Sequence, residues 1–165
     1  MSKLYVDEIR PKTSGNQVLF PDKPAFSVYL NTAVNSQNYT GADAVIPFDS
    51  EDFDIGSNVS ISSNAVFTAP VAGVYQFSLS LLFGSSSGAT WLSSYLYIDG
   101  APVSSSSNLT YRNLTDPDVD AYSTLTSSHL IQLTASQTVT PYLRVAGDTS
   151  VDVRQGTRFS GYLVG

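Results

Sequence analysis

Apolar and polar residues alternate along several short stretches of this 165-residue chain. The clearest is GVYQFSLSLLF, residues 73–83, in which Tyr75, Phe77, Leu79 and Leu81 occupy every second position and mostly polar residues lie between them. Successive side chains of an extended chain point to opposite faces, so this stretch predicts a strand with one buried face.

Other stretches have the same character: AFSVYLN, AVFTAP, WLSSYLYIDGAPVSS, SSHLIQLTASQTVTPYLRV and RFSGYLVG. Asp99-Gly100 predicts a tight hairpin turn in the third of these, and Ala135-Ser136-Gln137 marks the turn of a second strand pair in the fourth. No window of about a dozen residues has a helical period. Many short strands separated by turn signals predict an all-β fold, an antiparallel β-sandwich or jelly roll.

Two polar stretches interrupt the strand signals, at 84–90 and at 104–120. The first reads as a flexible connector. In the second, Tyr111, Arg112 and Asn113 combine an aromatic ring with polar groups, a composition that suits contact with sugar or protein. The alternative for this flank loop is a plain hydrated loop.

Residues 1–23 differ from the rest and are expected to form a leader ahead of a single domain, 24–165. Pro and Gly punctuate the leader, and its apolar residues are too few to make a core. We therefore expect them to be buried against a neighbouring molecule. These attachment candidates are Leu4, Val6, Ile9, Val18, Leu19 and Phe20.

Composition narrows the function. Only 13% of the residues are charged, and the net charge of −6 with a pI near 4.4 disfavours nucleic acid and anionic membrane as partners. No apolar run reaches the roughly 18 residues of a membrane-spanning helix. Cysteine is absent, which excludes disulfides and thiolate metal sites. The first residues contain no apolar signal-peptide core, so we expect synthesis in the cytoplasm.

The order of these stretches resembles the globular head of complement component 1q, within the tumour-necrosis-factor-like superfamily. FTAPVAGVYQFS, 67–78, is similar to the family's Phe-Thr, Pro, Gly, Tyr, Phe, Ser pattern, and FSGYL, 159–163, looks like its closing strand. The chain departs from the family in lacking a collagen repeat, the cysteines of animal members, an aromatic shortly before Phe67 and a Gly-Asp turn near residue 136.

The resemblance implies a homotrimeric jelly roll with both chain ends at one pole. It implies that RFSGYLVG is a central strand beside PAFSVYLN, near the threefold axis. The residues that would then serve as core and trimer contacts are Phe26, Tyr75, Phe77, Phe159 and Tyr162; the alternative is that they fill the core of one subunit only.

The same resemblance, with antiparallel strands counted back from the last one, places three turns at the pole far from the chain ends. These apex loops are candidates for ligand contact: Asp99, Gly100 and Ala101, then Ser136 and Gln137, then Arg154 and Gln155.

Catalysis has little support in the sequence. His129 is the only histidine, and no G-x-S-x-G motif accompanies it. Acidic residues gather in DSEDFD, 49–54, and in DPDVD, where Asp116, Asp118 and Asp120 resemble the start of a calcium loop but lack its glycine and distal glutamate. We expect no enzyme activity and no cofactor, with calcium as the one metal to consider.

The leader LYVDEIRPKTSGNQVLFP resembles those of tailed-phage fibre and virion proteins. The sequence thus predicts a non-enzymatic, homotrimeric structural or adhesion protein of a virus particle, either a phage fibre or a capsid or tail decoration protein. Residues 1–23 would hold it to other virion proteins, and its free end would meet a host-surface glycan or protein. The alternative is a free-standing lectin-like module that binds carbohydrate or protein, assisted by calcium.

Overall fold

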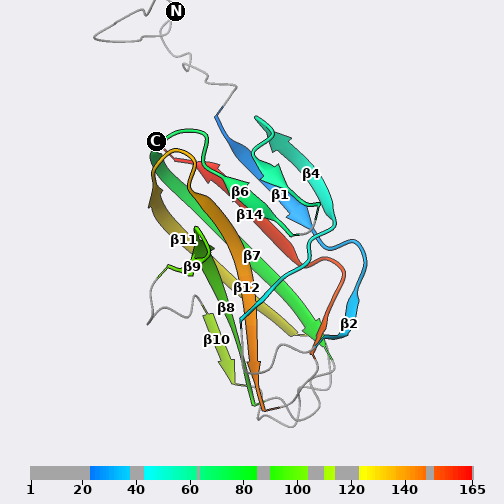
Figure 1. Ribbon diagram of the computed structural model, residues 1–165. Helices are drawn as coiled ribbons and strands as arrows, with labels where there is room; N and C mark the ends of the chain where they lie inside the picture. Colours follow the sequence, from blue (N-terminus) through cyan, green and yellow to red (C-terminus); the bar gives the residue numbers. More distant parts are fainter. Residues whose placement is uncertain are drawn as a thin grey trace, which may run out of the picture.

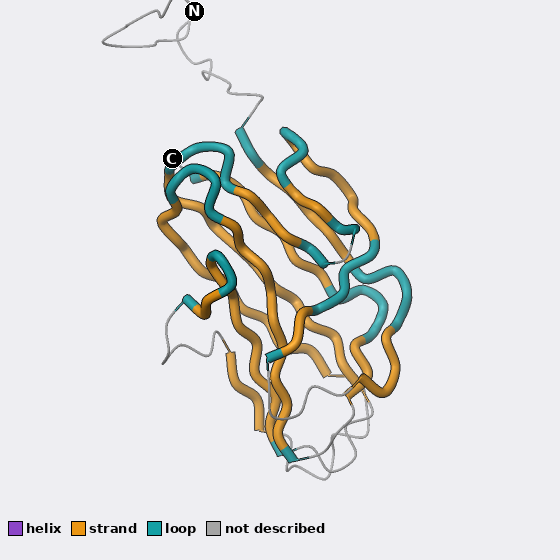
Figure 2. The backbone as a smooth tube through the Cα atoms, viewed as in Figure 1, coloured by secondary structure: helices purple, strands orange, loops and turns teal. Residues whose placement is uncertain are grey.

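The computed structural model describes residues 23–37, 43–62, 64–84, 90–103, 110–113, 123–147 and 151–164. These residues form two antiparallel sheets packed face to face (Figure 1). Turns and loops connect the strands (Figure 2). The predicted all-β sandwich is therefore confirmed. The attachment candidates of the leader, and Asp116, Asp118 and Asp120, lie outside the described residues.

Sheet A is built around β7 (Gly73–Gly84), which has β11 (Ser123–Leu133) along one edge. Along the other edge, two strands lie end to end: β13 (Val151–Val153) and β14 (Arg158–Leu163). The sheet continues outward from these two strands through β2 (Val34–Gln37), which pairs with β13, and through β1 (Ala25–Tyr29) and β4 (Ser50–Ile55), which follow β14.

Sheet B is built around β12 (Thr138–Ala146) and β8 (Trp91–Ile98). Shorter strands complete it: β10 (Thr110–Asn113) and β9 (Ala101–Pro102) pair with β8, β3 (Ala44–Val45) and β6 (Val66–Thr68) pair with β12, and β5 (Val59–Ser60) pairs with β6.

The core between the sheets follows from the two-residue period. In β7, Tyr75, Phe77, Leu79 and Leu81 are buried and the residues between them are only half-buried, as the alternation predicts. Aromatic rings fill the centre, where Phe26 and Phe67 stack with centroids 5.2 Å apart.

Two of these rings lie over position 161 of β14 and leave room there only for glycine. A Cβ added there would come within 2.7 Å of Phe77 and 2.8 Å of Phe26, closer than side chains tolerate. The position faces the core, since its neighbours Ser160 and Tyr162 face away from sheet B. A residue larger than glycine would have to displace a packed ring.

The last strand lies beside β1 and inside sheet A, as the resemblance implied. β14 sits between β7 and β1, with Phe159 opposite Val28 and Gly161 opposite Phe26. The backbone N–H of Leu163 donates to the carbonyl of Pro24 at 3.0 Å, so the first and last described segments meet at one end of the sandwich. We call this end the base (the top of Figure 1).

The prediction of a strand pair around Ala135-Ser136-Gln137 is wrong. β11 pairs with β7 in sheet A and β12 pairs with β8 in sheet B, so the turn crosses from one sheet to the other. Two backbone groups of this turn, the N–H of Ser136 and the carbonyl of Gln137, form hydrogen bonds with Ala69 in the loop after β6. Ser136 N–H donates to the carbonyl of Ala69, and Ala69 N–H donates to the carbonyl of Gln137.

The three apex turns do not share a pole, which corrects the second topological prediction. Leu133 lies opposite Gly73 and Leu163 opposite Tyr75, so the turn at Ser136 and Gln137 is at the base. The turn at Asp99, Gly100 and Ala101 lies beside it, because Asp99 accepts a hydrogen bond from Gln137.

Arg154 and Gln155 lie in the opposite half of the sandwich, where Arg154 N–H donates to the carbonyl of Leu82. The strands on either side of them, β13 and β14, both run antiparallel to β7 along the same edge. Residues 154–157 therefore bulge out of one interrupted strand and do not reverse the chain. The sequence analysis treated residues 154–157 as a chain reversal. That assumption placed the turns at Asp99–Ala101 and Ser136–Gln137 at the pole far from the chain ends, whereas both lie at the base.

The flank loop is also corrected in part. Tyr111, Arg112 and Asn113 belong to strand β10, paired with Ser93, Leu92 and Trp91 of β8.

Candidate functional site

The outer face of sheet A, which is turned away from sheet B, carries an ordered set of small polar side chains. Cross-strand register puts Ser27 of β1 opposite Ser160 of β14, Ser160 opposite Ser78 of β7, and Ser78 opposite Ser128 of β11. Four strands thus contribute one serine each to a single row that runs across the sheet. We call these four residues the serine row.

Hydrogen bonds tie the two ends of the serine row. Ser78 and Ser128 share a hydrogen bond between hydroxyls 3.3 Å apart, and Gln76 Nε2 donates to Ser128 Oγ at 2.6 Å. At the other end, Ser27 Oγ donates to Asp52 at 2.8 Å and accepts from Arg158 at 2.8 Å. The hydroxyls of Ser27, Ser78 and Ser128 are therefore held by neighbouring side chains.

Larger residues border the serine row on its base side. The next row across the sheet contains Ile55, Ala25, Tyr162, Gln76 and Leu130, in that order. Phe53 stands at the β4 end of the serine row itself, opposite Ser27. Four of the seven large apolar side chains exposed among the described residues lie on this face: Phe53, Ile55, Leu130 and Tyr162.

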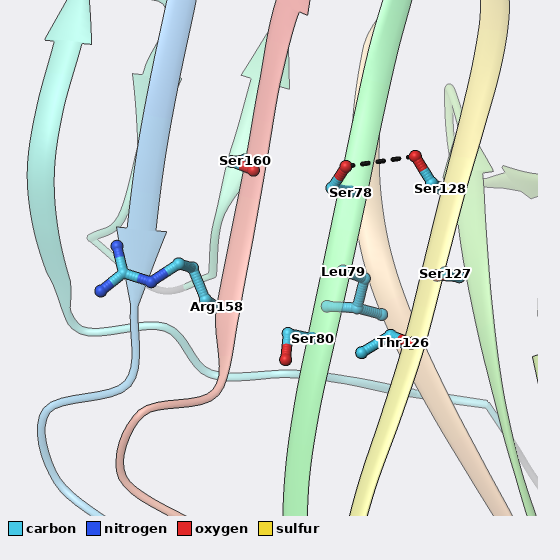
Figure 3. A pocket seen from close by; sticks show the side chains of 8 residues that line it. All are labelled: Ser78, Leu79, Ser80, Thr126, Ser127, Ser128, Arg158 and Ser160. Carbon is cyan, nitrogen blue, oxygen red and sulfur yellow. Dashed lines mark hydrogen bonds between the residues drawn. The ribbon is translucent and has the colours of Figure 1, made fainter.

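The contrast between small serines and larger borders makes the face hollow. One depression of about 420 Å³ is lined by residues of β7, β11 and β14, including Ser78, Ser80, Ser128 and Ser160 (Figure 3). A second, of about 300 Å³, shares Ser78 and Ser160 with the first and extends to Phe53 and Tyr162. Together they form a shallow trough along the serine row.

Charge on this face is confined to one side. The guanidinium of Arg158 turns away from the depression toward β1 (Figure 3), where it pairs with Asp52 and lies 5.4 Å from the ring of Tyr29. The face therefore carries hydroxyl groups bordered by aromatic residues, and Arg158 is already paired with Asp52. Such a surface suits burial against another protein better than it suits binding of a free ion.

The acidic stretch 49–54 does not converge on a point. Asp49 accepts from the backbone N–H groups of Asn31 and Thr32, and Asp54 accepts from those of Asn58 and Val59. Asp52 is bound to Ser27 and Arg158. No cluster of three or more His, Cys, Asp or Glu side chains that could hold a metal ion occurs in the part of the chain that the structure describes.

Known proteins show the same fold. The C1q domain matches residues 25–164, which is most of the chain. The chain belongs to the C1q domain family. A search of curated proteins finds no match.

Solved structures agree. The globular domain of zebrafish complement 1qA is 19% identical with a TM-score of 0.55, over 87% of this chain and 98% of that one. Murine APRIL at pH 5.0 is 12% identical with a TM-score of 0.57, over 86% and 98%. The Eiger TNF of S. frugiperda is 14% identical with a TM-score of 0.56, over 87% and 94%.

C1q and TNF-like domains are generally non-enzymatic, and trimeric assembly is typical of them. His129 is the candidate catalytic residue of the sequence analysis. It lies opposite Phe77 on the core side of β11, half-buried, and burial lowers the pKa of its imidazole. Within the described ranges no helix is long and apolar enough to cross a membrane.

The predicted core and trimer contacts divide into two groups. Phe26, Tyr75, Phe77 and Phe159 are buried in the core of the single subunit. Tyr162 is 53% exposed on the outer face of sheet A, beside the trough. Of the five, only Tyr162 stands where another subunit could touch it directly.

The predicted turn residues have local partners. Asp99 accepts hydrogen bonds from the backbone N–H of Thr138 at 2.8 Å and from Gln137 Nε2 at 3.0 Å, so its carboxylate links two turns at the base. Arg154 pairs with Asp152 at 2.8 Å beside a small surface depression that Gln155 and Leu82 also line.

The serine row was not predicted. Ser78 and Ser160 could be read from the sequence as outward positions of strands 73–83 and 158–163, but the alignment of all four serines across four strands depends on the register.

Proposed function

We propose that this C1q domain is a homotrimeric, non-enzymatic binding and structural module whose subunits associate through the outer face of sheet A. The observation that carries the proposal is the concentration of exposed Phe53, Ile55, Leu130 and Tyr162 around a trough of serines. Interface cores are depleted in charge and enriched in aromatic residues, and this face has both properties.

The trough explains how subunits could approach closely. Serine side chains are short, so a neighbouring subunit can lie near the backbone of β14 and β7 while Tyr162 and Phe53 pack at the border. The hydroxyls keep their hydrogen bonds within the sheet or through trapped water, which interfaces commonly hold.

Light scattering at matched concentrations tests the association. We expect the wild-type chain to have about three times the 17.7 kDa mass of one chain. Ser160→Arg, which puts a long charged side chain in the trough, should yield monomers. Ser62→Arg, at an exposed position in the loop between β5 and β6, is the matched control and should remain trimeric. A monomeric wild type would contradict the proposal.

We also infer that the trimer is a component of a virus particle, as a phage fibre or a capsid or tail decoration protein. Residues 1–24 precede the region that matches the family, and the resemblance of residues 4–21 to virion leaders supports an attachment role. Such a role places the protein in the virion, with host-surface glycan or protein as its outer partner.

The virion role is tested by peptide mass spectrometry of density-banded virus particles from the culture in which the gene is expressed. We expect peptides of this chain in the particle band, and their loss after deletion of residues 1–23. Detection only in the soluble fraction would reject the virion role without affecting the trimer.

A further inference from the structure

Sheet B has its own concentration of aromatic side chains, on the face turned away from sheet A. In β8 and β12 the residues Leu92, Leu96, Leu143 and Val145 are buried, so the alternate positions face outward. These outward positions include four half-buried aromatic residues. We call them the aromatic platform: Trp91, Tyr95, Tyr97 and Tyr142.

Contacts hold the rings of the platform in place. Tyr97 and Tyr142 stack with centroids 3.9 Å apart and planes 26° from parallel. Tyr142 lies directly opposite Tyr95 across the two strands. The guanidinium of Arg144, the next outward residue of β12, lies 6.0 Å from the centroid of Trp91.

One carboxylate organises the polar groups. The Tyr97 hydroxyl donates to Oδ2 of Asp43, and Oδ1 of Asp43 lies 4.0 Å from Nε of Arg144. Burial and the neighbouring Asp43 raise the pKa of Tyr97 to about 12, so the phenol stays neutral at ordinary pH. The Arg144 side chain is 41% exposed and lies beside the rings.

We propose that the aromatic platform binds a neutral oligosaccharide. A pyranose ring has an apolar C–H face that packs on aromatic side chains, and a rim of hydroxyls that bond to planar polar groups such as guanidinium and carboxylate. The platform offers the aromatic faces and the Arg144 side chain, in an arrangement that the Asp43 carboxylate helps to fix before binding, so little ordering is required when the ligand arrives.

Charge selects a neutral ligand over a charged one. A cationic ligand, which aromatic groups also attract, would meet the guanidinium of Arg144. An anionic ligand would meet Asp43 and a chain of net charge −6. The strand from Trp91 to Tyr97 extends about 20 Å at the usual rise per residue, so the surface accommodates a chain of sugars in place of a single ring.

The platform is on the opposite face of the sandwich from the proposed trimer interface. It would therefore stay accessible in a trimer, which would present three copies and gain avidity for a repeating polymer. The site itself does not depend on the trimer, since the four residues of the platform, together with Asp43 and Arg144, belong to one subunit.

Trp91 is the only tryptophan of the chain, so its fluorescence reports on the platform directly. The wild-type protein is titrated with maltohexaose, cellohexaose, xylohexaose and chitohexaose, each up to about 10 mM, which covers weak specific binding. We expect a saturable change with at least one of them, unaffected by added 0.5 M NaCl. Tyr142→Ala should weaken that binding at least tenfold. Val71→Ala, at an exposed position remote from β8 and β12 in sequence, should leave it unchanged.

Two results would overturn the proposal. One is the absence of a saturable change with all four oligosaccharides, and the other is a change that persists in Tyr142→Ala. Saturation with tetramethylammonium in place of a sugar would assign the platform to cations and also overturn it. Light scattering of the same samples keeps the two proposals apart, because a monomer that binds sugar rejects only the trimer and a trimer that does not bind rejects only the platform.

Discussion

The side chain of Thr157 makes the hydrogen bonds to the backbone of Leu82 that a neighbouring strand would otherwise make. The backbone N–H of Leu82 donates to Thr157 Oγ1 at 3.0 Å, and the same hydroxyl donates to the carbonyl of Leu82 at 3.1 Å. These are the two bonds that an antiparallel neighbour would make, and they fall where residues 154–157 bulge away from β7. One fully buried threonine thus bridges the gap between β13 and β14.

Thr157→Val keeps the shape of this side chain and removes its hydroxyl. We expect a loss of about 1–3 kcal/mol in the free energy of unfolding, because the backbone N–H of Leu82 loses its partner, while the Leu82 carbonyl keeps the hydrogen bond from Arg154 N–H. Urea unfolding measures it. Thr157→Ser, which retains the hydroxyl, should lose less. Equal stability of Thr157→Val and wild type would show that the bulge does not need the bridge.

Gly161→Ala tests the packing of the core against β14. The added methyl group would overlap the rings of Phe77 and Phe26, so we expect a destabilisation of about 1–3 kcal/mol. Ser160→Ala, one residue earlier on the outer face, is the matched control and should unfold near the wild-type denaturant midpoint. A Gly161→Ala protein as stable as wild type would mean that the rings have room to move.

Asp99 should make stability depend on pH in the acid range. The backbone N–H of Thr138, followed by the side chain of Gln137, lowers the pKa of Asp99 below its ordinary 3.8. A carboxyl whose pKa is depressed by folding contributes stability above its unfolded pKa and loses it as pH falls through the folded value. The stability difference between wild type and Asp99→Asn, measured by urea unfolding from neutral pH down to pH 2, should therefore narrow as pH falls. A difference that is constant with pH would contradict this account.

The sequence predicts the fold class and the buried positions of single strands better than it predicts the serine row and the aromatic platform. Alternation in 73–83 predicts which side chains of β7 are buried, because that pattern is local. The turn at Ser136 is equally visible in the sequence, but local residues cannot show that it joins two sheets. That outcome is decided by the pairing of β11 with β7 and β12 with β8.

The three apex turns were predicted to share one pole of the sandwich, and this prediction was wrong for a similar reason. Gly156, with a φ of 93°, marks a turn-like backbone in the sequence region before β14, and turn residues there suggest a chain reversal. Only the pairing of both Val153 and Arg158 with β7 shows that the chain continues in the same direction. The serine row and the aromatic platform are likewise products of register, which no single strand encodes.

The most direct test of the trimer is the reactivity of a single thiol placed on either face. The chain has no cysteine, so Ser160→Cys and Thr140→Cys each introduce one, in the trough of sheet A and on the outer face of sheet B. Each variant is reacted with a maleimide as a purified assembly and after dissociation by dilution. We predict that the thiol at position 160 reacts at least tenfold more slowly in the assembly than after dilution, while the thiol at position 140 reacts equally fast in both. Equal reactivity at position 160 in the two states would contradict an interface on the outer face of sheet A.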